Sequence, residues 1–415
     1  MIKKIFVVIV LLTSTQFFSL SLVTDGEFKV IEAIVLGLLI ASVALGPLLL
    51  PPEEHRYPVH GFKVGVWLIL AGVALSGISA YFNFAQPMQV TLVTQRFMYY
   101  YFLFFFLHEY RVDPALLKDV LLFLGLTFSI IYFASMADNS LVTTQMMAQR
   151  DTLRIALPGI LFLVIGLFIS LQRAVEERRY VYFLLFFLFT TNIIVDATRS
   201  VMLSTLLAAL PLLYVYLKRR FVGTIAVLLV GSALSAFYLY GIVSSVWSSI
   251  IGAANLSDGN FAVRILAVRY FFAHLFPNSL SYLFGNGVAS QLTTYGQQVL
   301  QMKNSGYYQS DIGIVGDYTR FGMPYLLGVI TLCVSVLRNR RWTSDSYVVN
   351  SFYFIMISAI TLSNFGIPSH IAAICVLLYL FDSDVSASLA DSGNSSQADQ
   401  IGEGYGTLSI QDDSL

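Results

Sequence analysis

The hydrophobic positions of this chain fall into long runs, each close to the length of one helical crossing of a lipid bilayer. A crossing helix needs about 20 predominantly apolar residues. The runs predict twelve spans, centred on residues 5–23, 31–50, 64–85, 90–107, 117–136, 156–172, 180–196, 200–217, 221–245, 321–337, 346–364 and 367–381. The predicted fold class is therefore an all-α polytopic membrane protein, with one large external loop between the ninth and tenth spans.

The composition excludes a soluble protein of this length. Of the 415 residues, 57% are hydrophobic and 12% are charged, and the mean hydropathy is +0.74. A soluble chain would need a far more charged surface. Cys333 and Cys375 lie in apolar runs and are predicted to be membrane-buried thiols. The five histidines show no HxxxH or HxH spacing, and neither a metal nor a cofactor is predicted.

Lysine and arginine are distributed unequally between the two sides of the predicted membrane domain. With the N-terminus inside, fifteen fall inside and nine outside, which satisfies the positive-inside rule. The first apolar run is long enough to span and lacks a small-x-small cleavage site, so a retained first helix is favoured over a signal peptide. Both termini are predicted to be cytoplasmic. Residues 382–415 carry seven acids and no lysine or arginine, which predicts a disordered tail after a membrane domain of residues 1–381.

Seven of the nine outer basic residues are arginines. Arginine binds phosphate with two parallel hydrogen bonds and stays charged when buried, so this set suggests an anionic ligand at the outer face. The stretch VDATRSV places Arg199 at the start of a span, close to Asp196. For Arg199 and Arg264 ligand binding is favoured over pairing with an acid. For Arg320, three residues after Asp317, an ion pair is favoured.

The predicted external loop, residues 246–320, is unusually apolar. Residues 270–302 contain no Asp, Glu, Lys or Arg. Such a segment is predicted to lie on the membrane as an amphipathic or re-entrant piece that roofs a cavity. Within it, RILAVRYFFAHLF predicts a helix whose arginines, Arg264 and Arg269, are about 140° apart and need not share a face. His274 is predicted to be a hydrogen-bonded packing residue.

The motifs TRS, LFGNG and SDIGIVGDYTRFGMP, together with the topology, resemble the Wzy-type O-antigen and exopolysaccharide polymerases, which share a superfamily with the O-antigen ligases. The resemblance implies a metal-independent glycosyltransferase in the bacterial inner membrane, with its active site facing the periplasm. Such enzymes take glycan from an undecaprenyl-pyrophosphate carrier and join it to an acceptor sugar. The implied partners include a flippase and a chain-length regulator, and no nucleic acid.

The site predictions follow from this resemblance. Ligases have a histidine about eleven residues before the glycine that opens the next span, and counting back from Gly322 gives Asp311. The aspartate at this position favours a polymerase over a ligase, with Asp311 as the general base. Its small and apolar neighbours are expected to leave the carboxylate partly dehydrated. Gly313 and Gly316 are expected to let the backbone approach a sugar. A helix cap is the alternative role for Asp311. The residues predicted to bind substrate are Arg199, Arg264, Arg269, Arg154, Arg96, Gly285 and Gly287.

Other functions are weighed against a polymerase, and a purely structural or sensory membrane protein ranks below both an enzyme and a transporter. A ligase, which transfers glycan to lipid A-core, is the alternative within the enzyme class. A transporter of lipid-linked oligosaccharides would need charges deep in several spans and often two similar halves. The only DxD sequence, at Asp382 and Asp384, lies in the predicted cytoplasmic tail, so a metal-dependent nucleotide-sugar enzyme is not inferred.

Overall fold

The computed structural model of the chain describes residues 2–49, 62–144, 146–149, 152–196, 198–218, 260–343 and 346–404. Within this part the chain is helical apart from one short β-hairpin. The ninth predicted span, residues 221–245, and the first residues of the predicted loop, 246–259, lie outside it.

Most of the described helices lie in the apolar runs of the sequence, and α12, α13 and α14 lie in the predicted external loop. The first group comprises α1 (Ile2–Ser14), α2 (Asp25–Leu49), α3 (Phe62–Phe84), α4 (Met88–Thr94), α5 (Phe102–Tyr110), α6 (Pro114–Ala137), α7 (Ile160–Glu177), α8 (Tyr180–Val195) and α9 (Arg199–Lys218). The second comprises α12 (Asn260–His274), α13 (Ser279–Phe284), α14 (Thr294–Asn304), α15 (Gly313–Asn339), α16 (Ser346–Ser358) and α17 (Pro368–Gly404). Strands β1 (Met146–Gln149) and β2 (Thr152–Ile155) form the hairpin, and the 3-10 helices include η1 (Gln16–Ser19), η2 (Arg96–Tyr101), η4 (Gln309–Ile312) and η6 (Asn364–Gly366).

Five helical segments in the described part are long and apolar enough to cross a membrane. They are Asp25–Gly46, Phe62–Phe84, Pro114–Ala137, Gln309–Asn339 and Pro368–Ser388. A sixth arises if Met88–Thr94 and Arg96–Tyr110, which meet at 58°, form one broken span. Three more apolar helices, in α8, α9 and α16, are shorter. The protein is therefore a helical membrane protein by length and composition, and the full count of twelve spans stays a prediction.

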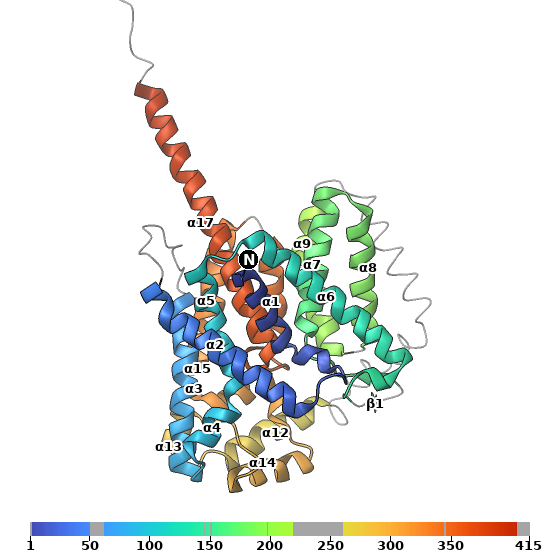
Figure 1. Cartoon of the computed structure of the whole chain (residues 1–415), viewed down its shortest axis with the longest axis vertical. Coiled ribbons are helices and arrows are strands. Elements are labelled where there is room, and N and C mark those ends of the chain that lie inside the picture. The colour runs from blue at the N-terminus through green and yellow to red at the C-terminus, as the bar shows by residue number, and fades with distance from the viewer. Residues whose placement is uncertain are drawn as a thin grey trace, which may run out of the picture.

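Two groups of polar contacts mark opposite ends of the helical bundle. At one end, here the tail end, Lys3 Nζ donates to the Tyr110 carbonyl (2.9 Å), and Ser346 Oγ donates to Gln172 Oε1 (2.9 Å). Figure 1 shows the N-terminus and the far part of α17 at this end. At the opposite end, here the loop end, Asn83 Nδ2 donates to Ser281 Oγ (2.9 Å). Helices α12, α13 and α14 lie there.

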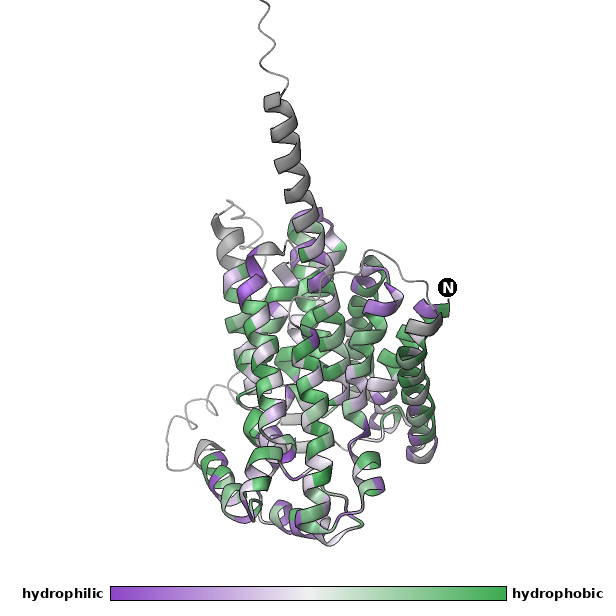
Figure 2. Cartoon of the chain, turned by 90° about the vertical axis from the view of Figure 1, so that its left-hand side faces the viewer, coloured by the Kyte–Doolittle hydropathy of each residue, from purple (hydrophilic) through white to green (hydrophobic). Residues whose placement is uncertain are grey.

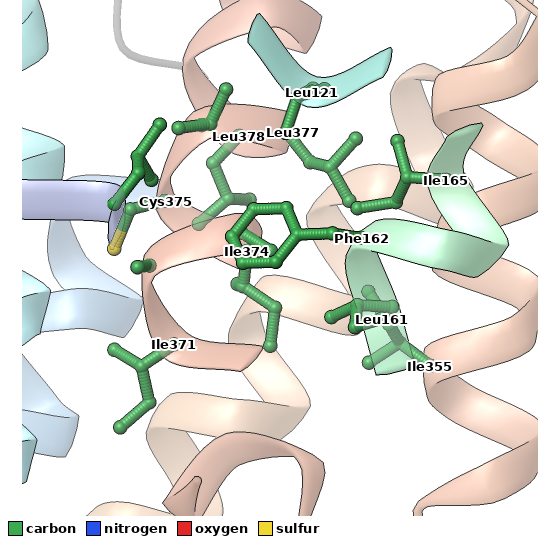
Figure 3. Packing of buried hydrophobic residues seen from close by; sticks show 14 of the residues in the cluster. Leu121, Leu161, Phe162, Ile165, Ile355, Ile371, Ile374, Cys375, Leu377 and Leu378 are labelled. Carbon is green, nitrogen blue, oxygen red and sulfur yellow. The ribbon is translucent and has the colours of Figure 1, made fainter. Parts of the chain in front are cut away.

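Helix α17 is the central helix of the bundle. Every residue from Ile371 to Phe381 is buried, as expected for a helix that is hydrophobic on all sides. Figure 3 shows Ile374 and Leu377 of α17 facing Phe162 of α7. Hydrophobic positions dominate the middle of the bundle in Figure 2. Among the five long apolar helices of the described part, the segment that holds the shortest predicted span has the largest buried fraction.

Several predicted spans are interrupted. The first apolar run leaves the helix at Ser14 and passes through η1, where Gln16 to Ser19 have positive φ. The hydroxyls of Thr13 and Ser14 donate to carbonyls of α1. Such side-chain hydrogen bonds compete with the backbone hydrogen bonds of a helix and tend to bend it. The fourth predicted span breaks at Gln95, and α15 changes direction at Gly322 (φ 74°). Helix α16 ends at Ser358, before the predicted end of its span at residue 364.

Helix α17 does not end at the predicted domain boundary, residue 381. Helix α17 continues through the region predicted to be a disordered tail, as far as Gly404. The Asp382 side chain is 1% exposed and its Oδ2 lies 3.1 Å from His108 Nε2, while Val385 is buried. The acidic composition of residues 382–415 suggested a solvated segment, but Asp382 lies inside the bundle beside His108 of α5. The packed part of the helical bundle therefore extends at least to Val385, and the extent of the membrane domain stays a prediction.

Cysteine labelling checks the predicted sidedness. Ser305→Cys, exposed at the loop end, is expected to react with a membrane-impermeant maleimide in intact cells, and Ser388→Cys, on α17 at the tail end, only after permeabilisation. The matched control is the parent chain, whose Cys375 is buried and whose Cys333 is partly buried. Labelling of Ser388→Cys in intact cells would invert the assignment of the two ends.

Candidate functional site

Residues 260–312, here the roof segment, cover the loop end of the bundle with α12, α13, α14 and η4 (Figure 1). They have a hydrophobic cluster of their own, separate from the main core and made of Ala267, Phe271, Leu275, Tyr295, Val299, Met302 and Ile312. Phe84, the last residue of α3, stacks on Tyr295 at 4.1 Å between ring centroids. The roof segment is therefore a folded unit attached to the end of α3.

Helix α12 packs inward through Ala267 and Phe271, four residues apart on one stripe, and Leu275 follows the helix and joins the same cluster. Arg264 lies one turn earlier on the same stripe and is half-buried, whereas Arg269 is exposed on another side. The prediction that these arginines need not share a face is confirmed. Within the described residues, neither guanidinium forms a hydrogen bond or an ion pair. Both charges are therefore free to bind an anion.

The end of α3 holds the roof segment through side-chain amides. Gln86, which is fully buried, donates from Nε2 to the Val288 carbonyl (3.0 Å) and accepts at Oε1 from the Ser290 N–H (3.0 Å). Asn278 Nδ2 donates to Asn83 Oδ1 at 2.7 Å. These anchors were not predicted. The only signal in the sequence was a pair of amides in NFAQP, immediately after an apolar run.

Gly285 and Gly287 make a sharp turn against α15. Both have positive φ, 72° and 67°, and the N–H groups of Asn286 and Gly287 donate to the Arg320 carbonyl at 3.1 and 2.7 Å. A Cβ on Gly285 would lie 2.5 Å from that carbonyl oxygen. Both glycines are buried against protein. Packing thus explains their conformation, and their contact with a ligand stays a prediction.

Asp311 lies in η4, at the surface of the roof segment. Its carboxylate is exposed and accepts a hydrogen bond from Ser310 Oγ (3.2 Å). The N-terminus of α15 has Ile312 at its cap position and no side-chain cap, so Asp311 does not act as a helix cap. The expected partial dehydration is wrong, because apolar neighbours such as Ile312 turn into the cluster and leave the carboxylate in solvent.

The glycines after Asp311 approach protein backbone rather than open space. A Cβ on Gly313 would lie 2.2 Å from the Ala359 carbonyl oxygen, and one on Gly316 would lie 1.9 Å from the Gln309 carbonyl oxygen. The expectation that they admit a sugar is therefore corrected. They let α15 start close against η4 and the segment that follows α16.

Asp317 is the most buried carboxylate of this end, with 1% of its side chain exposed. It accepts hydrogen bonds from Ser363 Oγ and from the Tyr325 hydroxyl (3.3 Å). Its Oδ1 lies 3.6 Å from Arg320 Nη1, so the predicted ion pair is confirmed. Arg320 Nε in turn donates to Gln309 Oε1 (3.3 Å). This network joins η4 and α15 to the segment before α17, and no substrate hydroxyl can reach its carboxylate in this arrangement.

The remaining predicted residues have different surroundings. Arg96 Nε donates to Glu32 Oε2 at 2.5 Å, and this ion pair neutralises its charge. Arg154 lies in β2 and Arg199 begins α9 at the loop end, but both side chains lie outside the described part. His274 Nδ1 lies 2.9 Å from the Tyr270 carbonyl, so the predicted hydrogen bond is present, but the prediction of a packing residue is wrong because the side chain is exposed.

Comparisons with known proteins do not identify the chain. No family model matches it, and no curated protein matches it. Among the described residues, no group of three or more His, Cys, Asp or Glu side chains is placed to hold a metal ion. Any functional assignment therefore depends on the motifs and on the geometry of the loop end.

Proposed function

We propose that the protein polymerises undecaprenyl-pyrophosphate-linked oligosaccharide repeat units at its loop end, as a metal-independent glycosyltransferase. One observation carries the proposal. Asp311 is an exposed carboxylate on η4, and Arg264 on α12 has no ionic partner among the described residues. These two elements pack against each other in the roof segment. Of the motifs that resemble those of O-antigen and exopolysaccharide polymerases, SDIGIVGDYTRFGMP begins in η4 and continues into α15, LFGNG lies at the end of α13, and TRS lies at the start of α9.

The chemistry needs few protein groups. The oxygen of an acceptor hydroxyl forms a bond to the anomeric carbon of the donor, while the bond from that carbon to the pyrophosphate breaks. Asp311 accepts the hydroxyl proton, and arginine stabilises the charge that develops on the departing pyrophosphate. The polyprenyl chain stays in the bilayer, so the pyrophosphate lies at headgroup depth. In the proposed orientation the loop end faces the periplasm of the bacterial inner membrane, where a flippase delivers the donor.

Glycan analysis of a deletion strain separates this function from its alternatives. Loss of a polymerase leaves single repeats on the final acceptor. Loss of an O-antigen ligase, the alternative enzyme, leaves polymer on the lipid carrier without attachment to lipid A-core. Loss of a transporter leaves repeats on the cytoplasmic side of the membrane. Either of the last two results would overturn the proposal.

Arg264 offers a direct test of pyrophosphate binding. In purified protein, Arg264→Ala is expected to lower kcat/KM for the lipid-linked donor by about 10- to 100-fold, the loss of one charge-assisted hydrogen bond worth about 1.5–3 kcal/mol. Arg264→Lys should recover little, because an ammonium lacks the two-pronged fit to phosphate.

Arg269→Ala is the matched control, since Arg269 lies on the same helix, is exposed and ranks as a weaker candidate for the same role. We expect its effect to be smaller than that of Arg264→Ala. Equal kinetics for Arg264→Ala and wild-type protein would remove Arg264 from the site.

A further inference from the structure

Three aromatic rings form a continuous stack on the roof segment. Tyr270 and His274 of α12 stack with ring centroids 4.1 Å apart and planes inclined by 20°. Tyr307, between α14 and η4, stacks on Tyr270 at 4.7 Å and 25°. Tyr270 contacts both other rings, so a ligand could stack only at the two ends of the set. These ends are His274, which is exposed, and Tyr307, which is partly exposed.

The stack is held in place by the backbone around it. Gly306 (φ 85°) turns the chain after α14, and the Tyr307 N–H donates to the Met302 carbonyl at 3.0 Å. Tyr270 and Tyr307 both pack on the hydrophobic cluster of the roof segment. A ring held in this way loses little conformational freedom when a ligand covers it.

The stack leads directly to the proposed general base. Tyr307 is four residues before Asp311, and Tyr308, 44% exposed, lies between them. Helix α12, which carries Tyr270 and His274 of the stack, is in contact with η4, which carries Asp311. The Asp311 N–H donates to the Tyr308 carbonyl at 3.2 Å, so a ligand on Tyr307 would lie within four residues of the Asp311 carboxylate along a compact turn.

We propose that Tyr307, supported by Tyr270 and flanked by Tyr308, is the binding platform for the acceptor glycan. One face of a pyranose ring carries mainly C–H groups, which pack on an aromatic face, and its hydroxyls stay at the rim in contact with water and polar side chains. The platform takes the acceptor rather than the donor because it adjoins the carboxylate that receives the acceptor proton. This inference rests on the proposed function.

Steady-state kinetics test the platform, with purified full-length protein in nanodiscs, lipid-linked donor and a soluble acceptor oligosaccharide. Tyr307→Ala is expected to raise KM for the acceptor about threefold to tenfold, the equivalent of one aromatic contact of about 0.5–1.5 kcal/mol. KM for the donor should not change, and Tyr307→Phe, which keeps the ring, should behave as wild type.

Tyr282→Ala is the matched control. Tyr282 is 42% exposed and stacks on Phe276 at 4.3 Å, in a second aromatic group on the other side of α12. An acceptor KM for Tyr307→Ala within twofold of that for Tyr282→Ala would overturn the inference. The inference would also be overturned if kcat and thermal stability fell together while the KM values for donor and acceptor both rose. That pattern would show that Tyr307 contributes only to packing.

A binding measurement separates this inference from the function on which it rests. If wild-type protein makes no polymer, the proposed function fails, and saturation-transfer NMR with the free oligosaccharide then tests the platform by itself. Transfer to the glycan in wild type that disappears in Tyr307→Ala supports the platform. Absence of transfer in wild type overturns it.

Discussion

Replacing Asp311 by asparagine is expected to lower the rate of glycan transfer by ~10²–10⁴-fold, the usual effect of losing an acid–base group. Asparagine keeps the size of the side chain and one acceptor oxygen but cannot take a proton from the acceptor hydroxyl. Because Asp311 is exposed and does not cap α15, the substitution should leave the fold unchanged. The measurement is polymer formation from a lipid-linked oligosaccharide by purified protein, with donor affinity measured in parallel.

Ser310→Ala is the control for Asp311→Asn, since it removes the hydroxyl that donates to the Asp311 carboxylate but leaves the carboxylate itself. We expect it to keep most of the activity. A rate for Asp311→Asn within a few-fold of wild type would show that the base lies elsewhere. His274 would be examined next, because its side chain is exposed, whereas Asp317 is enclosed.

Asp317→Ala is expected to destabilise the protein by about 3–5 kcal/mol, the range found when one partner of a buried ion pair is removed. The substitution leaves Arg320, whose side chain is 18% exposed, without its carboxylate, and the Ser363 and Tyr325 hydroxyls without their acceptor. The measurement is the free energy of unfolding in mixed micelles as the fraction of sodium dodecyl sulfate rises.

The double variant Asp317→Ala, Arg320→Leu separates an unpaired charge from lost packing. Removing both partners leaves no isolated charge, so the double variant should be more stable than Asp317→Ala alone. The non-additive part is the coupling energy between the two side chains. If the double variant is as unstable as the sum of its single substitutions, the ion pair contributes nothing to this junction.

Some side-chain relationships could be predicted because they depend only on helix geometry. The Asp317–Arg320 pair is three residues apart within one helix, and the separation of Arg264 and Arg269 follows from 3.6 residues per turn. The spacing of Arg264 and Arg269 in the sequence did not show which side of α12 faces the hydrophobic cluster of the roof segment. The half-buried state of Arg264 and the exposure of Arg269 depend on packing against α14 and η4.

Contacts between distant residues could not be predicted in the same way. Arg96 and Glu32 are 64 residues apart, and Gln86 and Ser290 are 204 apart. Both contacts depend on which helices become neighbours. The ion pair with Glu32 means that Arg96 has no free charge for a ligand. The hydrogen bond between Gln86 and Ser290 attaches the roof segment to the end of α3.

The lengths of the apolar runs were enough to predict a helical membrane protein, because a helix of about 20 apolar residues matches the thickness of a bilayer. Within each run, composition alone did not determine where helices break, as at Gln95 and Gly322, since broken backbone pairs must find partners elsewhere in the fold. Only the tertiary structure decided that Asp382 is enclosed and Asp311 is exposed. Both are acids beside apolar residues, and what separates them is whether another helix covers the side chain.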